Sequence, residues 1–148
     1  MRREQPLSWD DVYRDLQRLG ALLEEKGSWE GIIAITRGGL VPAALIARFL
    51  DIKLVETLCI TSYDDRVQGS LSIIKTAGMA EQSKGKGWLL IDDLVDTGET
   101  ARKALDMFPE AHFATLYAKP QGLPLVHTHV GNFAQNTWLI FPWERDRF

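Results

Sequence analysis

The chain has 148 residues, of which 45% are hydrophobic and 25% charged, with a net charge of −3 at pH 7. These values fit one globular domain with a hydrophobic core, and they disfavour a nucleic-acid-binding protein, which usually carries a basic excess. No apolar run approaches the ~18 residues of a membrane-spanning helix, the N-terminus lacks the apolar stretch of a secretory signal, and a single cysteine, Cys59, indicates a reducing, cytoplasmic setting.

The first predicted element is a helix over about residues 8–27. Ser8 is a candidate N-cap, and Asp11 follows three residues later, as in a capping box. Gly27 supplies a stop. Hydrophobic residues recur at helical spacing in between, at Val12, Leu16, Leu19 and Leu23.

The rest of the chain alternates predicted strands and helices. Strands are expected at 32–36, 53–61, 88–92 and 112–119, and helices at 40–50 and 97–107. The polar, glycine-containing segment that follows the second strand is predicted to form a hairpin around Gly69. Residues 136–148 are predicted to form a short strand and coil. This order predicts an α/β fold, with a mostly parallel sheet flanked by helices.

Three of the predicted strands end in charged residues that could bind a ligand. The first runs into "TRGG", residues 36–39, the third into Asp92 and Asp93, and the fourth into Lys119. Ligands of open α/β sheets bind beyond the carboxyl ends of the strands. We therefore expect these three strand ends to meet at one edge of the sheet.

The sequence "DTGET", residues 96–100, lies between a predicted strand and a predicted helix. A helix N-terminus offers unpaired N–H groups, Gly98 permits a tight turn, and threonine hydroxyls can donate further hydrogen bonds, which together suit a phosphate. The alternative is a plain helix cap in which Asp96 and Glu99 form a pair. One cap does not need the two additional acids that precede it.

The other candidate ligand residues also allow two interpretations. Asp92 and Asp93 could bind Mg²⁺ or accept hydrogen bonds from sugar hydroxyls, or they could be solvated turn acids. Arg37 could hold a phosphate bidentately or be a surface residue in an ordinary turn. Lys119 could be a surface lysine or contact a ligand, and Trp138 could belong to the core or stack on a ligand. Each of them, taken alone, fits the structural role better.

Together these motifs resemble a known family. A hydrophobic strand followed by "DD", a spacer and "DTGET" is similar to the phosphoribosyl diphosphate (PRPP) motif of type I phosphoribosyltransferases. The stretches "WEGIIAITRGGLVPAALIAR", "CITSYDD" and "NTWLIFPWE" resemble, in the same order, bacterial xanthine-guanine phosphoribosyltransferases. The resemblance implies a single type I phosphoribosyltransferase domain over 1–148, with a flexible lid over about 62–86 and a base-binding segment over about 119–148.

The resemblance also implies an activity. It is purine salvage, the transfer of the phosphoribosyl group of PRPP to N9 of a 6-oxopurine (guanine, xanthine and, less readily, hypoxanthine), with Mg²⁺ as cofactor. A homotetramer and a loose association with the inner membrane face are further implications. Two alternatives remain open, namely a regulator that senses PRPP or nucleotides on the same fold, and a phosphoribosyltransferase for another base.

The resemblance assigns the PRPP-binding roles. Arg37 and Gly38 would hold the pyrophosphate, often across a cis peptide between them. Asp92 and Asp93 would accept the ribose hydroxyls, with Asp93 at the Mg²⁺ site. The loop that would hold the 5′-phosphate consists of Asp96, Thr97, Gly98, Glu99 and Thr100.

The base-binding roles follow from the same resemblance. Asp96 would face N7 of the purine and act as the catalytic residue in proton transfer. Lys119 would donate to O6, and Trp138 would stack on the base. Leu139 would bind the exocyclic group at C2 through its backbone. A lid near residues 63–75 would cover the sugar, with Gly69 where relatives carry a basic residue.

Overall fold

The computed structural model describes residues 2–62 and 71–145. Its main sheet has six strands in the order β4-β3-β2-β5-β6-β7, and all neighbours are parallel except β3 and β4. The strands are β2 (Gly31–Thr36), β3 (Val55–Ser62), β4 (Leu71–Lys75), β5 (Trp88–Val95), β6 (His112–Ala118) and β7 (Gly131–Asn132). The predicted α/β fold with a mostly parallel sheet is confirmed.

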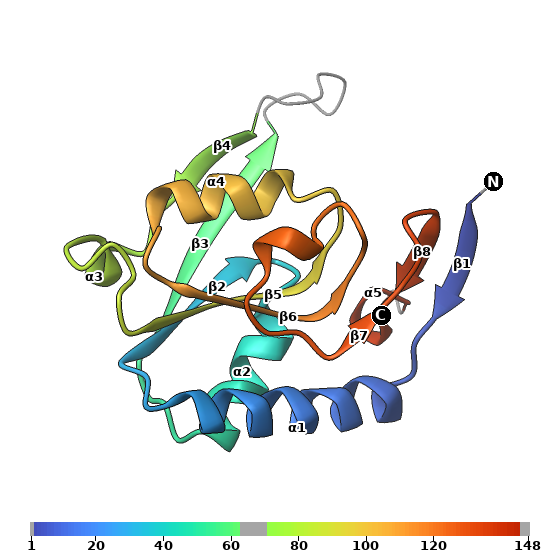
Figure 1. Cartoon of the computed structure of the whole chain (residues 1–148), viewed down its shortest axis with the longest axis horizontal. Helices are drawn as coiled ribbons and strands as arrows, with labels where there is room; N and C mark the ends of the chain where they lie inside the picture. The colour runs from blue at the N-terminus through green and yellow to red at the C-terminus, as the bar shows by residue number, and fades with distance from the viewer. Residues whose placement is uncertain (1, 63–70, 146–148) are drawn as a thin grey trace.

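Helices cover both faces of this sheet (Figure 1). On one face lie α1 (Trp9–Lys26) and α2 (Leu40–Phe49), and on the other lie α4 (Glu99–Met107) and the short α3 (Gly78–Glu81). A 3-10 turn at Leu123–Leu125 and α5 (Pro142–Arg145) complete the helical elements. No helix in the described part of the chain is both long and apolar enough to cross a membrane.

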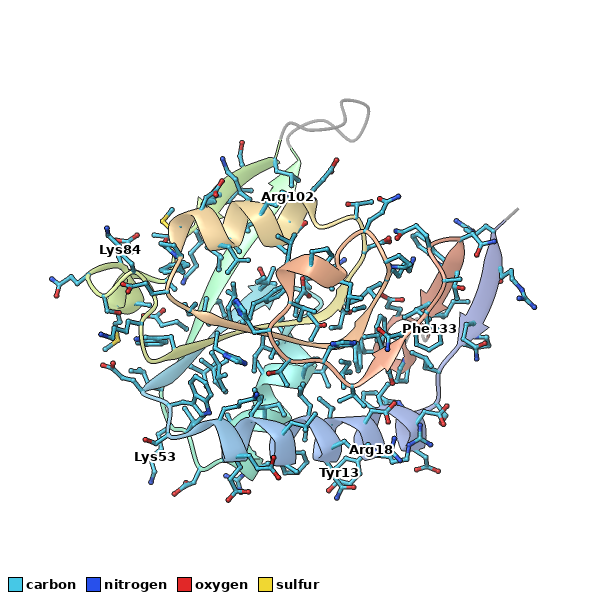
Figure 2. All side chains as sticks on the ribbon, in the orientation of Figure 1. Tyr13, Arg18, Lys53, Lys84, Arg102 and Phe133 are labelled. Atoms are coloured by element: carbon cyan, nitrogen blue, oxygen red, sulfur yellow. The ribbon has the colours of Figure 1, made fainter. Side chains whose placement is uncertain are left out.

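The start of α1 follows the sequence prediction. The Asp11 N–H donates to Ser8 Oγ at 3.0 Å, and the Ser8 N–H donates back to Asp11 Oδ2 at 3.0 Å, which makes a reciprocal capping box. Gly27 ends the helix with φ at 134°. Figure 2 shows Tyr13 and Arg18 on the side of α1 that points away from the sheet. The helix is therefore amphipathic, as its spacing predicts.

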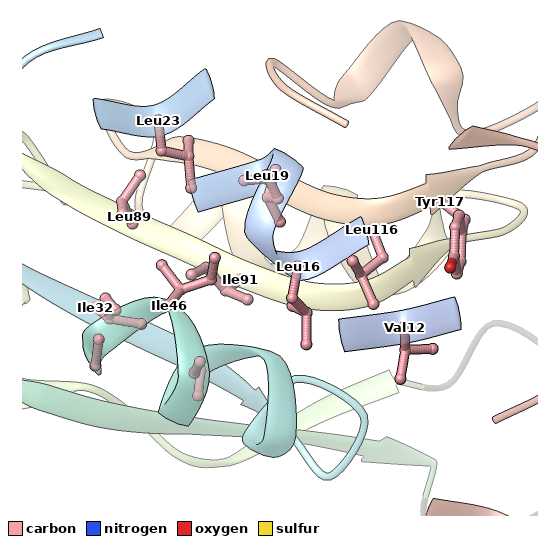
Figure 3. Close-up of a cluster of buried hydrophobic side chains, with 14 of the residues drawn as sticks. Val12, Leu16, Leu19, Leu23, Ile32, Ile46, Leu89, Ile91, Leu116 and Tyr117 are labelled. Carbon is pink, nitrogen blue, oxygen red and sulfur yellow. The ribbon is translucent and has the colours of Figure 1, made fainter. Parts of the chain in front are cut away.

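The sheet separates two hydrophobic cores. Ile32 and Ala34 of β2 face α1 and α2, whereas Ile33 and Ile35 face the α4 side, because successive strand residues point to opposite faces. Figure 3 shows the first core, where side chains of α1 meet those of α2 and the central strands. A strand buried on both faces reads as a continuous apolar run, which is what residues 31–35 show.

Strand β5 is longer than predicted. Its pairing with β6 continues from Asp92 opposite Thr115 to Val95 opposite Ala118. Asp93 therefore lies inside the strand rather than just after it, and Asp92, the last residue of the predicted strand, lies inside it as well. Backbone hydrogen bonds to the neighbouring strand stabilise an extended conformation at residues whose polar side chains favour a turn.

A second, two-stranded sheet was not predicted. Strand β1 (Arg3–Pro6) pairs in parallel with β8 (Thr137–Ile140), and the Leu7 N–H donates to the Ile140 carbonyl oxygen at 2.9 Å. The polar sequence of β1 gives no strand pattern, because its extended conformation depends on pairing with the distant β8. In Figure 1 these two strands lie at one end of the molecule.

The structure describes the two strands that flank the predicted hairpin tip. β3 and β4 pair antiparallel, with Ser62 opposite Leu71. The predicted tip at Gly69 and the start of the lid at Tyr63 lie outside the described residues. Within the range assigned to the lid, Ala77 and Ala80 are buried in the core beside α4.

Candidate active site

The three strand ends that carry candidate ligand-binding residues meet at one edge of the sheet. β2, β5 and β6 are parallel neighbours, so their carboxyl ends point the same way. The Lys119 N–H donates to the Val95 carbonyl oxygen at 3.0 Å, which ties the end of β6 to the end of β5. The common edge predicted from the sequence is confirmed.

Asp96 is the centre of a hydrogen-bonded group at this edge. Lys119 Nζ donates to Asp96 Oδ2 at 3.1 Å, and Gln135 Nε2 donates to Asp96 Oδ1 at 2.7 Å. Gln135 is itself held, because its Oε1 accepts the backbone N–H of Gln121 at 2.9 Å. Both oxygens of Asp96 thus accept hydrogen bonds, which hold the carboxylate in one orientation.

Lys119 is buried rather than at the surface. Its side chain is only 3% exposed, so the alternative of a surface lysine is wrong. Charged side chains are rarely buried without a partner, and Asp96 provides one. The ammonium group and the carboxylate form an ion pair that reaches the wall of a cavity.

The loop after β5 has the shape expected of a phosphate cradle. Gly98 has φ at 95° and precedes α4, without a side chain capping the helix. The pair of Asp96 and Glu99 in a plain cap is therefore wrong, because Asp96 bonds elsewhere and the Glu99 side chain is exposed. The loop encloses a cavity of about 100 Å³ lined by Asp92, Leu94, Val95, Asp96, Thr97, Gly98, Glu99, Thr100, Ala101 and Phe113.

The neighbouring carboxylates, Asp92 and Asp93, have raised pKa values. Burial, followed by the charge of Asp93, raises the pKa of Asp92 well above its usual range. Burial is also the main reason why the pKa of Asp93 rises to about 6, with the charge of Glu144 adding to the effect. The Asp93 N–H donates to Asp92 Oδ1 at 2.9 Å. The site thus concentrates negative charge that a cation would offset.

Arg37 and Gly38 lie opposite these acids. A Cβ atom at Gly38 would stand 2.7 Å from Asp93 Oδ1, so this position has no room for a side chain. Arg37 and Gly38 line a cavity of about 510 Å³ together with Trp143 and Glu144. The cis peptide bond joins Thr36 to Arg37, not Arg37 to Gly38 as the resemblance suggested. The motif letters alone do not specify which bond is cis.

A third cavity lies on the other side of Asp96. Its volume is about 280 Å³, and its walls are Arg2, Asp96, Lys119, Gln135, Asn136, Thr137 and Trp138. The Trp138 side chain is 48% exposed, whereas the neighbouring Leu139 is 5% exposed and points into the core. An exposed indole near the buried Lys119 and its half-buried partner Asp96 suits a flat, polar ring.

The comparisons with known proteins agree with this geometry. A family model described as "Phosphoribosyl transferase domain" matches residues 8–145. The chain belongs to the phosphoribosyltransferase family. A xanthine-guanine phosphoribosyltransferase of Nitratidesulfovibrio vulgaris strain DP4 is 55% identical over 142 residues, which cover 95% of this chain and 85% of the relative. Another from Desulfotalea psychrophila is 52% identical over 146 residues, covering 98% of this chain and 89% of the relative.

Solved structures support the same assignment. A purine phosphoribosyltransferase from Pyrococcus horikoshii has a TM-score of 0.80 at 25% identity, over 98% of this chain and 96% of its own. The type I phosphoribosyltransferase fold is thus confirmed, and so is the prediction that the chain is an enzyme of this family. A larger cavity of this phosphoribosyltransferase, about 830 Å³, lies beside α2, and none of the candidate site residues lines it.

Sequence reasoning missed three residues at this phosphoribosyltransferase site. Gln135 binds Asp96, Glu144 raises the pKa of Asp93, and Arg2 lies over Trp138. Gln135 lies in an irregular segment and Glu144 in the short helix α5, and Arg2 lies directly before the unpredicted strand β1. Only knowledge of the pairing between β1 and β8 could have placed Arg2 at the site.

Proposed function

We propose that the protein transfers the phosphoribosyl group of PRPP to N9 of a 6-oxopurine, with guanine and xanthine preferred over hypoxanthine. The products are the nucleoside monophosphate and pyrophosphate. The observation that carries this proposal is the position of Asp96, which lines both the phosphate-sized cradle and the cavity beside Trp138. A sugar phosphate on one side and a purine on the other would bring C1′ and N9 together. The curated relatives have the same named activity.

Lys119 accounts for the choice of a 6-oxopurine. Its ammonium group can only donate hydrogen bonds, and it lines the base cavity. Guanine, xanthine and hypoxanthine present an acceptor oxygen at C6, whereas adenine presents an amino group there. Two opposed donors in a buried site give strong discrimination, because neither finds a partner. On the other side of the ring, we propose that the backbone at Leu139 binds the exocyclic group at C2.

Asp96 is the proposed catalytic residue. In this reaction the bond between C1′ and pyrophosphate breaks, the sugar gains oxocarbenium character, and N9 bonds to C1′. The purine must then lose a proton, which the Asp96 carboxylate can accept at N7. Lys119 and Gln135 hold this carboxylate in one orientation. Proton transfer of this kind typically contributes about 10²–10⁴-fold to the rate.

The remaining PRPP contacts divide between the other two cavities. The cradle of residues 96–100 would bind the 5′-phosphate through its N–H and hydroxyl groups. Arg37 and Gly38 would bind the pyrophosphate, since the missing side chain at position 38 lets the backbone approach it. Asp92 and Asp93 would accept hydrogen bonds from the ribose hydroxyls.

The acidic residues also fit Mg²⁺. The pKa of the half-buried Asp93 is raised by desolvation and by the charge of Glu144, so a cation bound there would stabilise its charged form. In residues 2–62 and 71–145, no group of three or more His, Cys, Asp or Glu side chains could hold a metal ion alone. Mg²⁺ typically binds one or two carboxylates and takes its other ligands from substrate phosphates and water. When bound, Mg²⁺ supplies charge that stabilises the departing pyrophosphate.

Three further proposals rest on the family resemblance alone. The hairpin of β3 and β4 would carry a lid that excludes water from the reacting sugar. The protein would be a cytoplasmic homotetramer, and it would associate loosely with the inner membrane face. Sedimentation velocity would detect the tetramer, and co-sedimentation with anionic vesicles would detect the membrane association.

An assay panel tests the proposed activity. The protein is incubated with PRPP and Mg²⁺ and offered guanine, xanthine, hypoxanthine, adenine and orotate in separate reactions. We expect nucleotide from the first three and none from the last two. No nucleotide from any base would refute the proposed function, and turnover of adenine alone would refute the role of Lys119. Turnover of adenine or orotate instead of the 6-oxopurines would identify the protein as a phosphoribosyltransferase for another base.

A further inference from the structure

Arg2 lies against the residue proposed to stack on the base. The Cζ atom of its guanidinium group is 4.7 Å from the centroid of the Trp138 ring. Both residues line the cavity to which Asp96 and Lys119 also contribute. The guanidinium group therefore stands over the indole within the cavity that the purine would enter.

The pairing between β1 and β8 keeps Arg2 at this position. Arg3 is paired with Thr137 and Glu4 with Trp138, and the Arg3 N–H donates to the Asn136 carbonyl oxygen at 2.9 Å. The backbone next to Arg2 is thus attached to the strand that carries Trp138. The pairing thus holds the backbone at Arg2 beside the base cavity.

The Arg2 side chain can still move outward. Its ion pair with Glu4 is 3.6 Å long, and both side chains are 60% exposed, so the pair restrains it little. Two stacked layers with contacts of about 3.5 Å would place the guanidinium roughly 7 Å from the indole when a ring lies between them. That is a displacement of roughly 2 Å, which a long, exposed arginine side chain accommodates.

We propose that Arg2 is a base-binding residue and that the purine stacks between the Trp138 indole ring and the Arg2 guanidinium group. This inference rests on the proposed function, because it takes Trp138 as the inner stacking surface. Guanidinium groups stack on aromatic rings, and their charge is attracted to the π face. Xanthine is more acidic than guanine and is partly anionic near neutral pH. Arg2 therefore favours xanthine more than guanine.

The test compares Arg2→Ala with Arg3→Ala. Arg3 is the adjacent arginine, its side chain is exposed, and it is not among the described residues that line this cavity. We expect Arg2→Ala to raise the KM for guanine roughly two- to fivefold and that for xanthine by a larger factor. The KM for PRPP should not change, and Arg3→Ala should behave as wild type. Arg2→Lys, which keeps the charge without the flat group, should retain part of the xanthine preference but lose the stacking.

A binding measurement removes the dependence on turnover. In calorimetric titrations, Arg2→Ala should bind XMP more weakly than wild type does and ribose 5-phosphate equally well, because only XMP has a base. Unchanged or tighter binding of XMP would overturn the inference, since Arg2 would then be a bystander or a competitor of the base. Equal losses in Arg3→Ala would overturn it as well. A wild-type protein that forms no nucleotide from any base would instead refute the proposed function.

Discussion

At the scale of single residues, Asp96 depends on donors from two other parts of the chain. Lys119 follows β6, and Gln135 lies in the segment before β8. The carboxylate is therefore oriented from both sides before any ligand binds. Preorganised groups of this kind need little rearrangement when charge develops in the reaction.

Replacing Asp96 tests the proton-transfer role. Asp96→Asn keeps the shape but removes the base, so we expect kcat to fall at least about tenfold while the KM for PRPP changes modestly. Steady-state kinetics with guanine measure both. A variant that retained the full kcat would show that Asp96 does not handle the proton.

Gln135 is a positioning residue, and Gln135→Leu tests it. The variant loses the donor to Asp96 Oδ1, so we expect kcat to fall roughly three- to tenfold, which corresponds to the ~1 kcal/mol of a typical net hydrogen bond. The KM for PRPP should stay constant. Gln121→Leu is the matched control, because Gln121 contributes its backbone N–H and not its side chain. Equal effects of the two changes would argue against the positioning role.

At the scale of elements, the turn from β5 into α4 determines the shape of the cradle. Gly98 adopts a left-handed conformation there, and a Cβ atom would stand 2.7 Å from Leu125 Cδ1. This conformation costs a residue with a Cβ atom roughly 1–2 kcal/mol. The glycine thus permits both the turn and the close contact with the 3-10 turn.

Gly98→Ala should therefore affect both stability and PRPP binding. We expect the free energy of unfolding to fall by about 1–2 kcal/mol and the KM for PRPP to rise severalfold, since the N–H groups of the cradle would shift. Urea titration and steady-state kinetics measure the two effects. Gly78→Ala is the control, because a Cβ atom there meets nothing within 4 Å. A Gly98→Ala protein with wild-type properties would contradict this description of the turn.

The elements also show what the sequence could and could not predict. The capping box at Ser8 and Asp11 is local, and the apolar runs of β2 and β5 report burial directly, so the prediction of these elements is confirmed. The end of β5 depends on pairing with β6, and β1 depends on pairing with β8, so neither has a local pattern. The acids of "DDLVDTGET" could be found from their spacing, whereas Gln135 and Arg2 reach the site only through the tertiary structure.

At the scale of the whole molecule, the proposed PRPP-binding residues and the proposed stacking residue Trp138 lie on different sheets. The cradle and Arg37 belong to the six-stranded sheet, whereas Trp138 belongs to the pair of β1 and β8. An aromatic contact joins the two, because the ring of Tyr117 in β6 stacks on that of Phe141, directly after β8, with 6.1 Å between the ring centroids. Tyr117 also donates to Asp15 Oδ2 of α1 at 2.6 Å.

Acid should weaken the whole fold through His112. Burial, together with the charges of His127 and Lys26, lowers the pKa of His112 from 6.5 to about 4. Between these two pH values the unfolded chain binds more protons at this residue than the folded chain does, so stability is lost as the pH falls through this window. The effect should be on the order of 1–2 kcal/mol, because the ring is only partly buried.

His112→Gln provides the comparison. Glutamine cannot titrate, and it can still reach Thr128 Oγ1, which lies 2.7 Å from His112 Nε2. Urea unfolding at pH 7 and pH 4.5 should show a smaller loss of stability for the variant than for wild type. Parallel losses in both proteins would mean that His112 does not contribute to the acid sensitivity.

The partnership of β1 with β8 also fixes an order of events during synthesis. Arg3 leaves the ribosome before the strands of the main sheet, yet its partner Thr137 emerges only after those strands have been made. The strands of the main sheet, which carry the cradle of residues 96–100, can therefore pair early, whereas β1 cannot pair until β8 has been made. A nascent chain interrupted before β8 would already contain the cradle of residues 96–100 and Lys119 but would lack Trp138, so the proposed stacking surface for the base would form in the last step of folding.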